Sequence, residues 1–306
     1  MNRTPLRPAV LFVVVSLLAS LACGATGLAF PRTVVDGLGN EVHLETPPRR
    51  IFSTGLAMDN MVLTLVDPAR VVGVTRFATD PAMGSYVADQ VAPHMILVDA
   101  LSPEYIVAAD PDLVLVAVWN DPDSVEQVRR LGYPVYTFTD FNTVEDGLNN
   151  LLRLGELTGE EEAAAALVAE FRTRAGRISD LIADRPRPTV LYYNSWGSTV
   201  GSGTVLDDVI RYAGGINVVS AMGIEGWPQI DYELILHTNP EVIITDSGEA
   251  FVEQLKGDPL LASVAAVQSG KVYHIDHTDA LDHRIILAIE QLAEVLHAEV
   301  FAGAAQ

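Results

Sequence analysis

From residue 32 onward, short apolar runs rich in β-branched residues alternate with amphipathic segments. Apolar runs bounded by turn signals predict buried strands, and the amphipathic segments between them predict helices. In the first half the pattern predicts a hairpin over 33–45 and strands over 50–54, 70–75, 95–98, 113–118 and 135–138. This alternation predicts an α/β fold with mainly parallel sheets.

The second half repeats the alternation. Strands are expected over 189–195, 242–247 and 269–276, with helices over 205–215 and about 281–300. A chain of 306 residues exceeds what one apolar core usually organises. We therefore expect two α/β lobes, an N-terminal lobe over 30–142 and a C-terminal lobe over 186–306.

Residues 143–185 are expected to form the connecting helices. A first helix is predicted over about 143–157 and a second, longer one over about 158–183, with Thr158 and Glu161 in the spacing of a capping box. The second helix would be roughly 36 Å long at about 1.5 Å per residue. The pattern thus predicts two lobes joined by a single long, rigid helix.

Two segments of the chain resemble one another. Residues 101–115, LSPEYIVAADPDLVL, align with residues 230–244, IDYELILHTNPEVII, at a constant offset of 129. The alignment pairs Glu104 with Glu233 and Pro111 with Pro240. The same structural unit is therefore expected once in each lobe.

Residues 1–29 have the order of a secretory signal peptide. Arg3 and Arg7 precede an apolar run that ends near Ala22, and small residues follow. Cys23 closes the sequence SLAC, which is similar to a lipobox and predicts lipidation. The alternative is ordinary cleavage near Ala29. Either way we expect export to the periplasm or cell surface, and lipidation would add membrane contact through a lipid anchor.

The chain is strongly acidic, with a formal net charge of −21 from 19 basic and 40 acidic residues. Its only lysines are Lys256 and Lys271. Nucleic acid is excluded as a partner because phosphate binding requires a basic surface. The charge instead favours cationic ligands or a partner with a basic surface.

Ligands of open α/β sheets bind beyond the carboxyl ends of the strands, so residues at those positions are the candidate site. All three tryptophans fall in this set, which indicates a pocket with apolar walls. The candidates are Thr54, Leu56, Met58, Asp59, Arg76, Phe77, Trp119, Asn120, Tyr193, Asn194, Trp196, Trp227, His277, Asp279 and Arg284.

The chain has no nucleophile elbow, HExxH motif, phosphate loop or dinucleotide fingerprint. We therefore predict no catalytic residues, no enzymatic activity and no cofactor. The segment HIDHTDALDH, 274–283, gathers histidines and aspartates, but the first lobe offers it no partner at the cleft. Direct coordination of a bare metal ion is not expected, and His277 is the best candidate to contact a metal complex.

The motifs VVDGLGNEVHLETPPRRIFS, RVVGVTRFATDP, SPEYIVAADPDLVLV, LGELTGEEEAAAALVAEF, GSGTVLDDVIRYAGGINVV, WPQIDYELILHTNPEVIITD and HRIILAIEQLAEVL resemble the periplasmic binding proteins for iron-siderophores, heme and cobalamin. The resemblance implies a class III substrate-binding protein that serves the permease and ATPase subunits of an ABC importer. It also implies that Glu104 and Glu233 dock onto arginines of the permease. The alternative is that each glutamate only complements a helix dipole.

We therefore expect a monomeric binding protein that captures a small-molecule metal chelate between its lobes. An iron(III)-siderophore is the first expectation, followed by cobalamin and heme. The alternatives are a receptor for free divalent metal ions and an extracellular enzyme on a related scaffold. The chain departs from the family at Leu56, at Asp59-Asn60 and at Asp282-His283-Arg284. These departures fall in the pocket and leave the identity of the ligand open.

Overall fold

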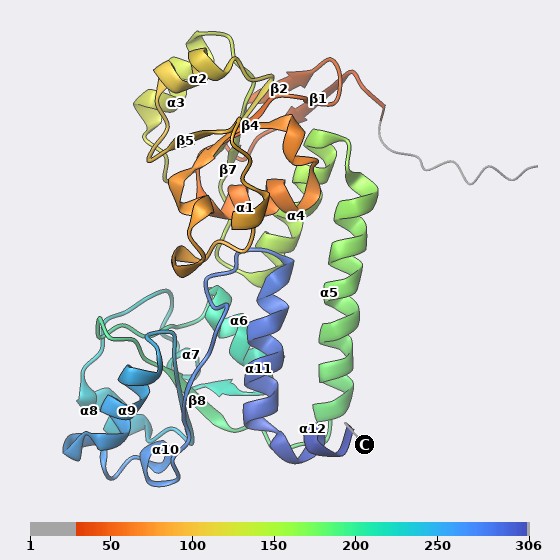
Figure 1. Cartoon of the computed structure of the whole chain (residues 1–306). Coiled ribbons are helices and arrows are strands. Elements are labelled where there is room, and N and C mark those ends of the chain that lie inside the picture. The colour runs from red at the N-terminus through yellow and green to blue at the C-terminus, as the bar shows by residue number, and fades with distance from the viewer. Residues whose placement is uncertain (1–28, 305–306) are drawn as a thin grey trace, which may run out of the picture.

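The computed structural model describes residues 29–304, which form two α/β lobes joined along one side by long helices (Figure 1). The two lobes and their mainly parallel sheets confirm the predicted fold class. None of the helices in the described part of the chain is both long enough and apolar enough to cross a membrane. The predicted signal peptide, apart from Ala29, and Cys23 lie outside the described residues.

The N-terminal lobe contains an antiparallel hairpin and a five-stranded parallel sheet of order β5-β4-β3-β6-β7. The strands are β1 (Arg32–Val35), β2 (Glu41–Leu44), β3 (Ile51–Ser53), β4 (Val71–Thr75), β5 (Ile96–Val98), β6 (Leu113–Ala117) and β7 (Val135–Phe138). Every residue of β4 and β6 is buried. Helices on both faces of a parallel sheet explain why these strands are continuously apolar in sequence.

The C-terminal lobe contains a smaller parallel sheet of order β11-β10-β8-β9. Its strands are β8 (Thr189–Tyr192), β9 (Ile216–Asn217), β10 (Val242–Thr245) and β11 (Val272–His274). The two-residue strand β9 was not predicted, since it is too short to produce a periodic pattern. The other three strands form within the predicted ranges.

The α-helices cover the sheets and connect the lobes (Figure 1). They are α1 (Leu56–Leu65), α2 (Pro103–Ala109), α3 (Pro122–Arg130), α4 (Val144–Thr158), α5 (Glu161–Ile182), α6 (Val205–Tyr212), α7 (Val218–Ala221), α8 (Tyr232–Thr238), α9 (Glu249–Gly257), α10 (Ala265–Gln268), α11 (Ile286–Leu296) and α12 (Ala298–Ala304).

Helix α5 is the strut that runs alongside both lobes (Figure 1). Its 22 residues give a length of about 33 Å at 1.5 Å per residue. The predicted capping box at its start is wrong, because Thr158 is the last residue of α4 and its hydroxyl donates a hydrogen bond to the Leu154 carbonyl at 2.8 Å. Gly159, with φ of +80°, ends α4 in the left-handed conformation, and α5 begins after Glu160.

The predicted final helix is also interrupted. A 3₁₀ turn over His283–Ile285 precedes α11, and His297 leaves the helical conformation at φ −132°, ψ 39° before α12 begins. His297 is only 3% exposed, so its side chain is packed inside the protein at the point where the helix breaks. Periodicity alone could not reveal this break because both helices are apolar on one face.

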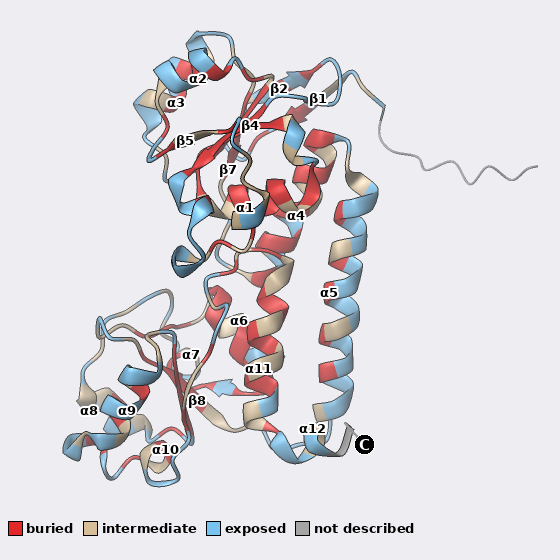
Figure 2. Ribbon diagram, viewed as in Figure 1, coloured by how far each residue is buried: buried red, intermediate tan, exposed pale blue. Residues whose placement is uncertain are grey.

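One apolar cluster extends through both lobes and the helices between them. It includes Leu115 of the first sheet, Leu151 of α4, Phe171 of α5, Ile289 of α11 and Ile244 of the second sheet. The buried face of α11 and the exposed outer face of α5 are visible in Figure 2. Each such large side chain contributes about 1.5–3 kcal/mol on full burial. The lobes therefore share a core and are not independent units on a flexible linker.

The internal repeat is present in the structure at the same offset. Helices α2 and α8 have seven residues each, and their positions differ by 129 residues. Asp110 and Asn239 end them in the left-handed conformation, at φ of 45° and 43°. Aspartate and asparagine tolerate this conformation better than most residues. Each lobe thus presents the same short helix at the same place in its sheet.

The close packing of α4 on α5 predicts opposite effects for one substitution at two glycines. A Cβ at Gly155 in α4 would lie 2.6 Å from the Cβ of Ala164 in α5, whereas a Cβ at Gly176 in α5 would meet nothing within 4 Å. Gly155→Ala should lower the free energy of unfolding by about 1–3 kcal/mol through overpacking. Gly176→Ala should raise it by about 0.5–1 kcal/mol because alanine favours the helix.

Urea denaturation of the two variants and the wild type measures both effects. If the two variants shift the free energy of unfolding in the same direction, the close approach of α4 to α5 is not a constraint on stability.

Candidate functional site

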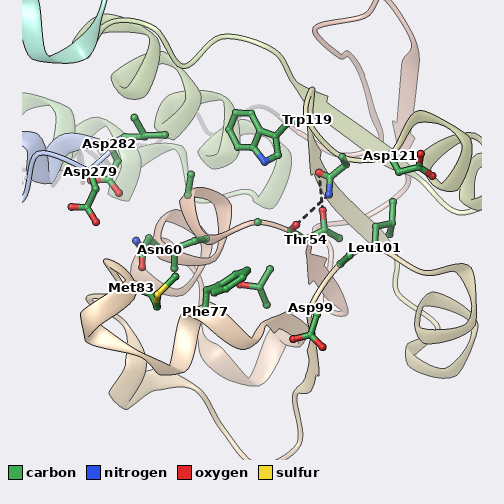
Figure 3. Close-up of a pocket in the computed structure, with 17 residues that line it drawn as sticks. Thr54, Asn60, Phe77, Met83, Asp99, Leu101, Trp119, Asp121, Asp279 and Asp282 are labelled. Atoms are coloured by element: carbon green, nitrogen blue, oxygen red, sulfur yellow. Dashed lines mark hydrogen bonds between the residues drawn. The ribbon is translucent and has the colours of Figure 1, made fainter. Parts of the chain in front are cut away.

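The carboxyl ends of both sheets face the space between the lobes, where the loops that follow them form a cleft. On the N-terminal lobe, Thr54 follows β3, Phe77 follows β4, and Trp119 and Asn120 follow β6. A cavity of about 510 Å³ lies against these residues. Its other lining residues are Gly55, Leu56, Ala57, Asn60, Thr75, Met83, Asp99, Ala100, Leu101, Asp121, Asp279, Leu281 and Asp282. Figure 3 shows that Asp279 and Asp282 lie at one end of this cavity and Asp99 and Asp121 at the other.

Two further cavities adjoin the first. One, of about 510 Å³, is lined by Tyr86, His277 and Arg284 among others. The other, of about 290 Å³, is lined by Phe141 and Trp227 among others. Asp279 borders all three cavities. The three spaces are therefore parts of one cleft between the lobes, a usual place for a ligand site.

Trp119 is positioned by hydrogen bonds of its neighbour Asn120. The Asn120 side-chain oxygen accepts a hydrogen bond from the Ala117 amide at 2.7 Å, and the Thr54 hydroxyl lies 3.2 Å from the same oxygen. The Trp119 ring packs against Phe141, with 4.4 Å between ring centroids. Because Trp119 is still 54% exposed, it offers an apolar surface to the cleft.

Trp227 is the aromatic residue of the opposite lobe. Its ring meets the Tyr192 ring edge to face, with centroids 6.2 Å apart. The Tyr192 hydroxyl donates a hydrogen bond to Asp246 at 2.7 Å. Burial of the ring, followed by this hydrogen bond and the charge of Asp246, raises the pKa of Tyr192. The tyrosine therefore stays protonated and holds both the carboxylate and the tryptophan in place.

Carboxylates dominate the polar lining of the cleft. Asp99, Asp121, Asp279 and Asp282 line the first cavity, and no lysine or arginine lines that cavity among the described residues. The third cavity adds Asp246 and likewise has no cation among its described lining residues. These cavities suit a ligand that is uncharged or positively charged.

The lobes touch each other beside the second cavity, which Tyr86 and Arg284 line. The Tyr86 hydroxyl of the N-terminal lobe donates a hydrogen bond to Asp282, and the Arg284 guanidinium lies over the Tyr86 ring at 4.0 Å from its centroid. Burial raises the pKa of Asp282 to about 6. Position 84 favours glycine for two reasons. The φ of Gly84 is +92°, and a Cβ there would overlap the Asp279 side chain of the other lobe.

Nine of the predicted site residues line the cleft. Thr54, Leu56, Phe77, Trp119, Asn120 and Asp279 line the first cavity, while Trp227, His277 and Arg284 line the adjoining ones.

Three predicted contacts are wrong because the side chains are buried in the lobes. Met58 and Asp59 are 0% exposed, since α1 turns them inward while Leu56 and Asn60 face the cavity. Tyr193 packs on Tyr232 in the core of the C-terminal lobe. Successive residues of a strand point to opposite faces, so Tyr192 lies on the face that contacts Trp227 and Tyr193 lies on the other.

Three other predicted residues lie outside the lining of the cavities. Arg76 is exposed and forms an ion pair with Asp99 at 2.9 Å. Asn194 closes a turn by accepting hydrogen bonds from the amides of Trp196 and Ser198. Trp196 stands on that turn and is 82% exposed. The strand-end rule identified the loop after β4, which contributes Phe77, but no residue of the turn over 194–198 lines the cavities.

Several lining residues were missed by the sequence analysis. Asp99 and Leu101 follow β5, and Asp121 follows β6, so the same strand-end rule applied to every strand would have found them. Met83 and Tyr86 come from the irregular loop after β4, which carries no periodic signal.

Within residues 29–304, no group of three or more histidine, cysteine, aspartate or glutamate side chains is arranged to hold a metal ion. His277, at φ +60°, lines the second cavity next to Asp279. The cleft has room to enclose a molecule.

The sequence model of a family described as "periplasmic binding protein" matches residues 51–278, about three quarters of the chain. The chain belongs to this family. It is 28% identical over 281 residues to a cobalamin-binding protein of Halobacterium salinarum, covering 88% of this chain and 75% of that protein. It is also 25% identical to an uncharacterized ABC transporter substrate-binding lipoprotein of Bacillus subtilis, covering 89% of this chain and 87% of that protein.

The crystal structure of the periplasmic binding protein MolA of Haemophilus influenzae, bound to molybdate, has the same fold. The TM-score is 0.72 at 21% identity, covering 89% of this chain and 93% of that one. Membership of the family therefore settles the architecture, while the ligand has to be argued from the residues of this cleft.

Buried Asp59 gives the stability of the protein a testable pH dependence. It is 0% exposed, and its Oδ2 accepts hydrogen bonds from the Thr75 hydroxyl and, at 3.1 Å, from the Thr75 amide. Burial raises its pKa from 3.8 to about 7. The folded protein therefore binds a proton that the unfolded chain releases between about pH 4 and pH 7, so stability should fall as pH rises through this window.

In Asp59→Asn this contribution should disappear. The free energy of unfolding of the wild type, relative to that of the variant, should change by about 1.4 kcal/mol per pH unit across the window. Urea denaturation at pH 5, 6, 7 and 8 measures it, and parallel profiles for the two proteins would contradict the buried, protonated carboxyl. Asp282 titrates in both proteins and cancels in the comparison.

Proposed function

We propose that this protein binds a cobalamin-type corrinoid in the cleft between its lobes and delivers it to an ABC importer. The observation that carries the proposal is the composition of the cleft. Aromatic rings of both lobes, Trp119 and Trp227, stand over cavities whose charged lining residues are carboxylates. Such a site favours a large ligand with apolar faces and hydrogen-bond donors at its rim.

Electrostatics separates the candidate chelates. Heme carries two carboxylates, and many iron chelates are anionic, so both would meet Asp121 and Asp279 in a cavity that no described lysine or arginine lines. The corrin ring of cobalamin carries amide side chains, which donate hydrogen bonds to carboxylates at no cost in charge repulsion. The acidic lining therefore supports cobalamin ahead of the iron(III)-siderophore, which was the first expectation from the family resemblance.

The size of the cleft supports the same ligand class. The three cavities, of about 510, 510 and 290 Å³, meet at Asp279. Together they offer room for a ligand larger than an ordinary metabolite. The cobalamin-binding relative from Halobacterium salinarum is consistent with this choice.

An uncharged or cationic iron(III)-siderophore is the second candidate, favoured by the same carboxylates. A receptor for free metal ions has less support because the described residues offer no cluster of metal ligands. The family also favours binding over catalysis, so we propose no enzymatic step.

The partner of the proposed transport step is an ABC permease with its ATPase subunits. Glu104 and Glu233 are both exposed, on the first turns of α2 and α8. Figure 1 places α2 and α8 on the side of the molecule opposite α5, one on each lobe. Val107 and Leu236, one helical turn further along, are 53% and 42% exposed. Each lobe thus offers one carboxylate and one apolar side chain at equivalent positions, which suits a permease with twofold pseudosymmetry.

The site of attachment to the membrane is proposed on sequence grounds. Cys23 would carry the lipid, and the Bacillus subtilis relative is named as a lipoprotein. One acylated cysteine would keep the protein close to its permease.

The three tryptophans provide a matched test of the ligand site. Trp119→Ala and Trp227→Ala should each weaken binding of cyanocobalamin roughly three- to tenfold, the usual energy of an aromatic contact beyond its area. Trp196→Ala should have no effect, because Trp196 is 82% exposed and outside the cavities. Isothermal titration calorimetry with cyanocobalamin, ferrichrome and heme measures the affinities. Tighter binding of heme than of cyanocobalamin would refute the electrostatic argument.

The twin glutamates provide a test of docking. The double variant Glu104→Arg, Glu233→Arg should abolish uptake while leaving ligand affinity unchanged, because like charges facing across an interface repel. Glu249→Arg is the control, since Glu249 is an exposed first-turn residue of α9 and shares only the helix-dipole role.

If the dipole role is the whole explanation, all three substitutions should cost about 0.3–1 kcal/mol of stability each. Uptake would then proceed normally in the double variant. Transport of radiolabelled cobalamin in cells, together with thermal denaturation, distinguishes the two outcomes.

A further inference from the structure

A groove of about 470 Å³ lies beside the strut, between α5, the start of α4 and the end of α6. It shares no lining residue with the three cavities of the cleft. Its floor is apolar: Leu148 and Phe171 are buried, and Ile182 and Tyr212 are half-buried. The groove is therefore a second concave surface of a size that suits a small molecule.

The rim of this groove carries the opposite charge to the cleft. Arg172, Arg185, Arg187 and Arg211 line it, with Glu145 as the one carboxylate among its described lining residues. The chain as a whole has 19 basic and 40 acidic residues. Four arginines around one apolar floor in so acidic a protein form a local positive field that would attract anions.

Two of these arginines form ion pairs with carboxylates, and the other two have N–H donors that are not used within the protein. Arg172 pairs with Glu145 at 3.0 Å, and Arg211 pairs with Asp208 at 2.5 Å. Arg187 donates one hydrogen bond, to the Gly215 carbonyl at 2.7 Å. Arg185 is exposed, and its one hydrogen bond among the described residues is that of its backbone amide to the Ile182 carbonyl at 3.0 Å. Since a guanidinium has five N–H donors, Arg185 and Arg187 keep most of theirs for a ligand.

Gly176 is an independent indication that the groove is kept open. It lies in the interior of α5, where glycine weakens a helix. Close packing does not require it, because a Cβ at this position would meet nothing within 4 Å. Gly176 does line the groove. Any larger side chain there would enter the space above the apolar floor.

We propose that this groove binds a small organic anion with an apolar body, of the type of an aromatic dicarboxylate. The apolar floor would take the body, and Arg185 and Arg187 would hold the acidic groups in charge-assisted hydrogen bonds. An inorganic anion would leave the floor uncovered, and a neutral aromatic molecule would leave the guanidinium groups without an anion. The site requires both features in one ligand.

The test uses isothermal titration calorimetry of the exported protein at low ionic strength with three probes. Isophthalate has the apolar body and two carboxylates, isophthalamide has the same shape without charge, and inorganic phosphate has charge without the body. Isophthalate should bind more tightly than either of the others at millimolar concentration. Its affinity should fall as salt is added, because the arginines are exposed.

Variants connect the binding to this groove. The double variant Arg185→Gln, Arg187→Gln should weaken isophthalate binding about tenfold or more through the loss of charge-assisted hydrogen bonds. Gly176→Leu, which keeps every charge but fills the groove, should abolish it. Arg177→Gln is the matched control, since Arg177 is exposed on α5 and does not line the groove. Trp119→Ala should also leave isophthalate binding unchanged, which separates this groove from the cleft.

The proposal is overturned if isophthalate does not bind, or if it binds no better than isophthalamide or phosphate. It is also overturned if Gly176→Leu, shown to be folded by thermal denaturation, binds isophthalate as the wild type does. None of these results bears on cobalamin binding in the cleft.

Discussion

The structure depends on an apolar core that the two lobes share. Helix α5 alone could hold the lobes at a fixed separation, but it could not fix their rotation. The packing of α4 and α11 along α5 does so, because Leu151, Phe171 and Ile289 belong to the same buried cluster as both sheets. This shared core makes the carboxyl ends of the two sheets face each other, and the cleft is a consequence of that arrangement.

Charge is distributed over the molecule by face. Carboxylates line the cleft and stand on α2 and α8, while four arginines surround the groove beside α5. A surface potential with this asymmetry selects ligands by sign before any hydrogen bond is made. The same fold with different side chains in its cleft would select a different ligand. This explains why a family that shares one architecture has members with unrelated ligands.

The sequence predicted the local structure well because its signals are local. Buried parallel strands require continuous β-branched runs, so β4 and β6 were evident from composition alone. The repeat of α2 and α8 was visible because residues 101–115 and 230–244 match at one constant offset, which pairs Glu104 with Glu233 and Pro111 with Pro240. By contrast, Thr158 was assigned to the wrong helix. A Thr-Gly pair can begin one helix or end another, and only the packing of α4 on α5 chooses between them.

The amino-acid sequence by itself determined that the loops after β3, β4, β6 and β11 line the cleft, because ligands of such sheets bind beyond the strand ends. It did not determine which side chains of those loops face the ligand. Leu56 lines the cavity and Met58 is buried two residues later, and Tyr192 and Tyr193 point to opposite faces of one strand end. The groove of arginines was likewise invisible, since Arg172, Arg185 and Arg211 come from separate segments. Side-chain direction and long-range proximity depend on how helices and sheets pack together, and that packing exists only in the folded chain.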